Sequence, residues 1–179
     1  MRHTMTVLPW LLPGLILSIL VGLAAGPRVG RALRTGWPVA WALVVGFGLV
    51  ISATLTPLSG VFEFGVPGSG VCDMSRLGPA PIQELVHIGD TSLNVLLFIP
   101  LGVAIGLLPR SRLKAVIACV AIVLPFVIET IQLLLPVLGR GCESADVADN
   151  LTGLLVGWLT GAGLAFAGRV ARDRGRHRL

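Results

Sequence analysis

The sequence predicts an all-α, polytopic membrane helix bundle of about five transmembrane helices, with the N-terminus out and the C-terminus in. Hydrophobic residues make up 54% of the chain and charged residues only 13%, and the mean hydropathy is +0.88. A soluble domain carries about 25% charged residues. The third observation is the unequal distribution of basic and acidic residues between the loops, which predicts the orientation. The whole chain, residues 1–179, is expected to form a single integral membrane domain.

The net charge of +5 also invites a nucleic-acid-binding interpretation. The basic residues, however, occur in short clusters between the apolar segments. Membrane orientation produces such a distribution. We therefore expect membrane lipids as partners and no nucleic acid.

Five apolar stretches approach the length of about 20 residues that crosses a hydrocarbon core of about 30 Å. They are residues 7–26, 38–56, 92–108, 115–138 and 150–167. Each must be a helix, because the hydrocarbon offers no water to satisfy backbone hydrogen bonds. The first stretch resembles a signal peptide, but a basic cluster at residues 28–34 follows it immediately and resists translocation. We interpret it as an uncleaved membrane helix.

The basic residues gather in alternate connections between the spans. They follow the first, third and fifth spans: Arg28, Arg31, Arg34, Arg110, Arg112, Lys114, Arg169, Arg172, Arg174, Arg176 and Arg178. The acidic residues fall mainly in the other connections: Glu63, Asp73, Glu84, Asp90, Glu143, Asp146 and Asp149. Because basic loops stay in the cytoplasm, the chain is predicted to be a multi-pass membrane protein with its N-terminus out and its C-terminus in.

The long outer loop at residues 57–91 is predicted to begin as irregular chain and to end as a helix. Glycines and prolines are frequent in its first part. From Pro81 onward, apolar and polar residues alternate as on a short amphipathic helix, which we place flat at the outer interface.

Two of the three cysteines, Cys72 and Cys142, fall in connections on the predicted outer side. That side is oxidising, so a disulfide between them is expected, and two independent thiols are the alternative. Cys119 lies within an apolar stretch and is expected to act as a small hydrophobic residue.

Polar residues concentrate near the predicted outer ends of the last three spans. They are Asn94, Glu129, Gln132, Arg140, Asp146, Asp149 and Asn150. Glu129 lies about 13 Å below the outer end of its helix, where a charge is costly, so its carboxyl group is expected to be either paired or protonated. Arg140 is the nearest basic candidate, and Asn94 is a candidate hydrogen-bond partner. We expect these side chains to line one pocket that opens outward and binds a ligand.

Several other interpretations of the same residues remain open. Glu129, Gln132, Asn94 and Asn150 could form a hydrogen-bonded clasp that only holds the helices together. Asp146, Asp149 and Asn150 suit the N-terminus of the fifth helix. Oxygen ligands from Glu129, Asp146 and Asp149 could hold a divalent cation, but the loop lacks the spacing of a calcium-binding loop. We expect no metal, no cofactor and no catalytic residue.

Small residues form a ridge on the fifth span. Gly153, Gly157 and Gly161 follow one another at a spacing of four. This spacing lets two membrane helices approach closely, either within the bundle or in a homo-oligomer. Pro100 and Pro125 are expected to kink the third and fourth spans.

Residues 90–163 resemble the VanZ-like family of small bacterial membrane proteins. The resemblance rests on three blocks: Asn94, Phe98, Pro100 and Gly102; then Glu129 and Gln132; then Arg140, Cys142, Glu143, Asp146, Asn150 and Gly153. It implies a protein of the cell envelope. The founding member of the family is linked to reduced susceptibility to glycopeptide antibiotics, teicoplanin in particular.

The leading hypothesis is a non-enzymatic envelope protein that binds a polar or amphiphilic ligand in an outer-leaflet pocket, with an envelope precursor or a glycopeptide as candidate partners. A membrane enzyme that acts on a lipid-linked envelope precursor is the alternative, with Glu129 or Asp149 as acid or base. A transporter is less favoured, because the inner halves of the spans carry no ionisable groups. A purely structural clasp is the remaining interpretation.

Overall fold

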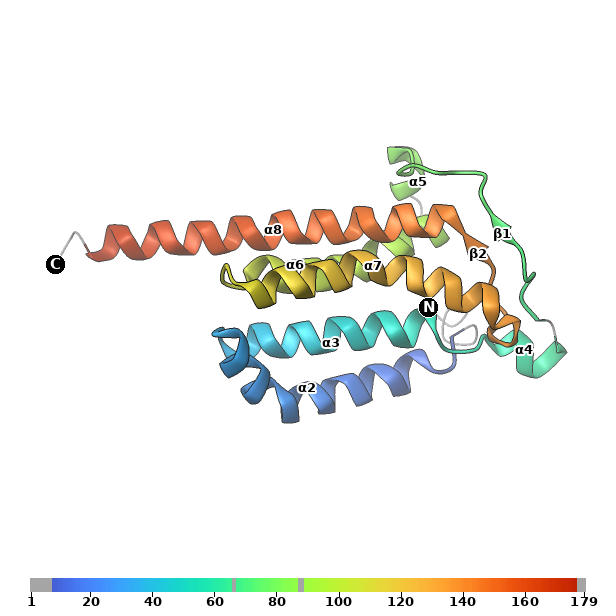
Figure 1. The fold of residues 1–179 in the computed structure, drawn as a ribbon, viewed down its shortest axis with the longest axis horizontal. Helices are drawn as coiled ribbons and strands as arrows, with labels where there is room; N and C mark the ends of the chain where they lie inside the picture. Colours follow the sequence, from blue (N-terminus) through green and yellow to red (C-terminus); the bar gives the residue numbers. More distant parts are fainter. Residues whose placement is uncertain (1–7, 66, 87–88, 177–179) are drawn as a thin grey trace.

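Five long helices run side by side in the computed structural model, counted over the residues that it describes, 8–65, 67–86 and 89–176 (Figure 1). They are α2 (Leu11–Leu33), α3 (Trp37–Thr54), α6 (Asp90–Leu107), α7 (Arg112–Leu134) and α8 (Ser144–Arg176). Each is long and apolar enough to cross a membrane. The predicted fold class and the five membrane helices are therefore confirmed.

Short elements connect the long helices at one end of the bundle. They are α4 (Ser59–Phe64), β1 (Cys72–Asp73), α5 (Ile82–Val86), the 3-10 helix η1 (Pro136–Leu138) and β2 (Cys142–Glu143). The short helix predicted after Pro81 is α5, whereas His87 and Ile88 of that prediction lie outside the described residues. Val7 and Arg178 also lie outside them.

The helix ends differ from the predicted spans for three local reasons. The apolar stretch of the first span ends before Leu33, but the backbone stays helical up to that residue. Arg34 then ends α2 in the left-handed conformation with φ 51°. Helix α7 ends at Leu134, since Pro136 disfavours the helical conformation of the residue before it. Helix α8 begins at Ser144, six residues before the predicted span, and carries Asp146 in its first turn, where a carboxylate is favourable.

Helix α6 lies at the centre of the bundle. It packs most extensively against α8 and also against α3, while α2 packs on α3 and α7 on α8. The largest fully buried apolar side chains come from α3, α6 and α7: Val50, Phe98, Leu101, Ile105 and Ile128. Pro100 and Pro125 both lie inside their helices. The residues that build the site at the end of the bundle are thus held by a common core.

Helices α6 and α8 run parallel and touch through their backbones. A Cβ atom on an α8 glycine would meet a carbonyl oxygen of α6: Gly153 that of Val95, Gly157 that of Ile99 and Gly161 that of Val103. Two α6 glycines return this contact, with Gly102 against the Leu154 carbonyl oxygen and Gly106 against that of Trp158. The predicted glycine ridge therefore packs within the bundle, and an oligomer built on it would have to displace α6.

Helices α2 and α3 pack against each other through a reciprocal pair of serines. The Ser18 hydroxyl donates to the Gly14 carbonyl at 2.7 Å, and the Ser52 hydroxyl donates to the Gly48 carbonyl at 2.7 Å. Each serine also packs on the glycine of the other pair, Ser18 on Gly48 and Ser52 on Gly14. Both hydroxyls are buried between the two helices, and each is satisfied by a carbonyl of its own helix.

The two ends of the bundle carry different connections. Short turns join α2 to α3 and α6 to α7 at one end, where the last turns of α8 project beyond the other helices (Figure 1). The long connections at residues 55–89 and 135–143 lie at the other end. The basic clusters are at the first end, which we call the basic end, and this agrees with the arrangement of loops on which the predicted orientation depends.

Candidate functional site

A strap of loop crosses the ends of α7 and α8 that lie opposite the basic end. We use this name for residues 67–80, which contain β1 (Figure 1). Strand β1 pairs in parallel with β2, and Cys72 forms a disulfide with Cys142. The Gly68 amide also donates to the Pro136 carbonyl at 2.7 Å. The strap is thus joined to the α7–α8 connection by a covalent bond and by backbone hydrogen bonds.

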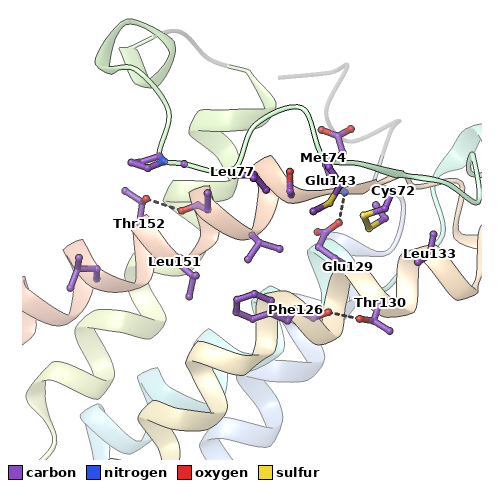
Figure 2. Close-up of a pocket in the computed structure, with 17 residues that line it drawn as sticks. Cys72, Met74, Leu77, Phe126, Glu129, Thr130, Leu133, Glu143, Leu151 and Thr152 are labelled. Atoms are coloured by element: carbon purple, nitrogen blue, oxygen red, sulfur yellow. Dashed lines mark hydrogen bonds between the residues drawn. A yellow bond between two sulfur atoms is a disulfide. The ribbon is translucent and has the colours of Figure 1, made fainter.

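The Glu129 side chain is buried beneath β2, with an exposed fraction of 5%. Its Oε2 atom accepts a hydrogen bond from the Glu143 backbone amide at 2.8 Å, which Figure 2 shows beside the disulfide. Sequence reasoning expected Arg140 as its partner. The partner is instead a backbone N–H, so this carboxylate holds β2 against α7.

Two other predicted residues bind the C-terminal end of α3. The Gln132 side-chain amide donates to the Thr54 carbonyl at 3.0 Å. The Arg140 guanidinium donates to the carbonyls of Ala53 and Thr56. The last carbonyls of a helix have no partner within it, so these bonds satisfy groups that would otherwise stay unpaired in a membrane. Burial lowers the pKa of Arg140, and the nearby carboxylates of Asp146 and Glu129 oppose this shift.

Asp149 forms an ion pair that the sequence did not reveal. The Arg76 guanidinium binds the Asp149 carboxylate with both terminal nitrogens, Nη1 to Oδ1 at 3.0 Å and Nη2 to Oδ2 at 2.6 Å. Asp149 is 1% exposed and Arg76 25% exposed. The bond to Asp149 raises the pKa of Arg76. The Ser144 hydroxyl donates to the Arg76 carbonyl at 2.7 Å, which fixes the strap to the first turn of α8.

A signal for Arg76 was present in the sequence but weak. It is one of the few basic residues on the predicted outer side, where acids predominate. A lone cation among acids is expected to find a carboxylate partner when both are partly buried. The sequence could not select Asp149 among the candidates, because the two residues are 73 positions apart.

The Asn94 and Asp146 side chains lie together between α6 and α8. Asn94 lies close enough to the Asp146 carboxyl group to act on it, and both side chains line the polar cavity described below. Both are half-buried. Asn150, one turn after Asp146, is 1% exposed, and within the described residues its Oδ1 atom has no hydrogen-bond partner. This side of the cluster therefore has fewer backbone bonds than the side around Glu129 and Gln132.

Two cavities open at this end of the bundle. The polar cavity, of about 700 Å³, is lined by four predicted residues: Asn94, Gln132, Arg140 and Asp146. The strap cavity, of about 680 Å³, lies between α7 and α8 under the disulfide and is lined by Glu129 (Figure 2). Glu143 lines both cavities, and Asp149 and Asn150 line neither of the two. The single pocket predicted from the sequence is thus divided in two by the β2 segment.

The lining of the polar cavity is chemically mixed. Its polar groups include three carboxylates (Asp90, Glu143 and Asp146), one guanidinium and two carboxamides. Leucines of α2, α3 and α6 add an apolar part to the lining, among them Leu11, Leu49 and Leu97. Such a lining fits an amphiphilic molecule with a charged headgroup and an apolar chain.

A family model described as VanZ/LLP1 matches residues 50–164 of the chain. The match begins within α3 and ends within α8, so it includes the disulfide and the whole lining of the strap cavity. It also includes the lining of the polar cavity except Leu8, Leu11 and Leu49. No curated protein and no solved structure matches the chain.

Proposed function

Because the chain belongs to the VanZ/LLP1 family of membrane proteins, we propose that it binds an amphiphilic ligand of the bacterial cell envelope in its polar cavity. One observation carries this proposal. Side chains from α6, α7, α8 and the α7–α8 connection, up to 52 positions apart, converge on one cavity beside an apolar wall: Asn94, Gln132, Arg140 and Asp146. A volume of about 700 Å³ falls within the range of about 300–1,000 Å³ typical of small-molecule sites.

The charges in the cavity indicate the kind of headgroup. Asp146 offers a carboxylate that binds a cationic or hydrogen-donating group, and Asn94 beside it offers both a donor and an acceptor. Arg140 offers a cation for an anionic group. A headgroup with both kinds of polar atom therefore fits better than a purely apolar molecule, and the leucine wall accommodates its chain.

A structural clasp competes with ligand binding for part of the cluster. Glu129, Gln132 and Arg140 each bind a backbone group of another segment. These bonds join α7, β2 and the end of α3 without any ligand. The clasp thus accounts for three of the predicted residues, and Asn94 and Asp146 remain as the residues that the ligand proposal needs most.

The substitution Asp146→Asn separates the two interpretations. It removes the charge but keeps the size of the side chain, and we expect it to abolish ligand binding with little loss of stability. A deletion strain would be complemented with each variant and its teicoplanin susceptibility measured, because the family resemblance implies this phenotype. Mass spectrometry of the lipids retained by the purified protein would provide a second readout.

Glu63→Gln is the matched control, since Glu63 is an exposed acid on α4 outside both cavities. We expect Asp146→Asn to behave like the deletion in both readouts, with the control behaving like the parent and both proteins present at equal levels in the membrane. Unchanged susceptibility together with an unchanged lipid profile would contradict the ligand proposal. Loss of the Asp146→Asn protein from the membrane would favour the clasp.

A further inference from the structure

A third cavity lies between α6, α7 and α8 and reaches the basic end of the bundle. We call it the basic-end cavity, and its volume is about 610 Å³. Its walls come from α6, α7 and α8 and are almost entirely apolar: Ile105, Ala118, Ile122, Leu151, Leu155 and Trp158. A cavity of this composition between membrane helices accepts hydrocarbon.

Polar residues line only one part of this cavity. Arg110, Ser111 and Lys114, from the α6–α7 connection and the start of α7, contribute to it. The Lys114 ammonium is fixed in place, because it donates to the Gly106 carbonyl at 3.0 Å and to the Leu108 carbonyl at 2.9 Å. The cation is thus held by the C-terminal end of α6, where it also interacts favourably with the negative end of the helix dipole.

The cationic charge at this rim is not neutralised by the protein. Arg110 and Arg169 both lie close enough to Lys114 to act on it electrostatically. Over the described part of the chain, the only ion pair is the one between Arg76 and Asp149 at the other end. Three cations therefore gather beside an apolar cavity without a carboxylate in contact, and like charges so arranged attract an anion.

From this combination we infer that the basic-end cavity binds an anionic phospholipid of the leaflet that faces the basic loops. The phosphate would contact Arg110 and Lys114, and an acyl chain would lie along the apolar wall toward Leu151 and Leu155. Those two leucines also line the strap cavity, so the apolar surface continues along the seam between α7 and α8. Basic pockets between membrane helices on this side are suited to anionic headgroups.

A diffuse attraction of basic loops to the membrane surface is the competing explanation. It predicts that every arginine at this end contributes alike. The chain offers a direct comparison, because Arg110 and Arg112 are both exposed but only Arg110 lines the cavity. Trp158 lines the cavity and is 40% exposed, so its fluorescence reports on a chain that enters.

The test uses the full chain in nanodiscs of phosphatidylcholine that contain increasing fractions of phosphatidylglycerol brominated on its acyl chains. Bromine quenches nearby tryptophan, and a site that fills gives quenching that saturates at a low fraction of the anionic lipid. Trp158→Phe should remove the saturating component. Arg110→Gln should raise the fraction needed for half-saturation about fivefold, as expected for one basic contact, and Arg112→Gln should leave it unchanged.

A second variant tests the cavity without changing any charge. Ala118→Phe fills the space between α7 and α8 and should also abolish saturation, with the thermal unfolding of each variant as a check of folding. Should Arg110→Gln fail to fold, Ala118→Phe and Trp158→Phe still decide the question. Equal effects of Arg110→Gln and Arg112→Gln, saturation that survives Ala118→Phe, or equal quenching by brominated phosphatidylcholine would each overturn the inference.

Discussion

Helix α8 has two packed faces that are built in opposite ways. Against α6, its glycines bring the two backbones into direct contact along three successive turns. Against α7, larger side chains such as Leu151 and Leu155 meet the neighbour, and both the strap cavity and the basic-end cavity open along this seam. We call these the closed face and the open face of α8.

The difference between the faces shows how one membrane helix can pack tightly against one neighbour and leave cavities against another. Between helices in lipid there is little hydrophobic driving force, so close approach depends on small residues at a spacing of four. The closed face has them on both helices, with Gly153 and Gly157 on α8 and Gly102 and Gly106 on α6. The open face does not, and space for lipid remains there.

The largest expected effect comes from breaking the closed face. Gly157→Leu would place a side chain against the Ile99 carbonyl of α6 and force the helices apart. We expect a loss of about 3 kcal/mol or more in the free energy of unfolding, the upper end for overpacking and a large share of the stability of a typical domain. Thermal unfolding in detergent and the amount of protein in the membrane would measure it.

The matched control for the closed face is Gly163→Leu on the same helix. Gly163 is exposed, and a Cβ there would meet nothing within 4 Å. This variant should unfold at the temperature of the parent. Equal destabilisation by the two substitutions would show that helix propensity rather than close packing decides, and the distinction between the two faces would fail.

The second-largest effect is expected from breaking the disulfide that holds the open face of α8 at the end nearest the strap. The disulfide between Cys72 and Cys142 joins the strap to the α7–α8 connection, where the packing of side chains leaves a cavity. Cys142→Ser should cost about 2–4 kcal/mol, because the crosslink closes a long loop. Thermal unfolding with and without reductant would measure the loss, and the variant should no longer respond to reductant.

Cys119→Ser is the control for the disulfide experiment. Cys119 is a free, exposed cysteine on α7. This variant should retain both the stability of the parent and its response to reductant. A parent protein whose unfolding ignores reductant would indicate that backbone hydrogen bonds alone hold the strap.

The smallest of the three effects is expected at the junction of the strap with the closed face. Asp149 lies one turn before Gly153 on α8 and is paired with Arg76 of the strap. Arg76→Met would leave the buried carboxylate without its cation, at a cost of about 1–3 kcal/mol in unfolding free energy. The double variant Arg76→Met/Asp149→Leu should recover part of this loss, since neither charge remains. If the two single losses simply add, the ion pair has no role at this junction.

The fold could be predicted from the sequence to the level of spans, because apolar length is a local property. The end of α7 and the start of α8 could not be placed from hydropathy. Pro136 and the acids of residues 143–149 determine where the helical backbone ends and begins, and hydropathy does not detect this effect. The sequence did not decide whether the glycine ridge packs against a helix of the same chain or against another copy of the chain. Gly102 and Gly106 on the third span have the same spacing as the ridge and, considered together with it, would have favoured packing within the chain.

The site could be predicted as a set of residues but not as a geometry. Asn94, Gln132, Arg140 and Asp146 do share a cavity. Glu129 lies on the other side of β2, because the Glu143 amide binds its carboxylate, and no sequence pattern specifies a bond between a side chain and a backbone amide 14 positions away. The partner of Asp149 was likewise hidden by distance along the chain.

The bond between Cys72 and Cys142 sets an order of events during biosynthesis. Cys142 leaves the ribosome 70 residues after Cys72, and α6 and α7 lie between them in the chain. If only one of these helices crossed the membrane, the two thiols would lie on opposite sides and could not meet. The crosslink therefore forms late, and a chain in which only one of the two helices has been inserted cannot complete it. A disulfide-bonded molecule thus shows that the segment between the two cysteines does not cross the membrane an odd number of times.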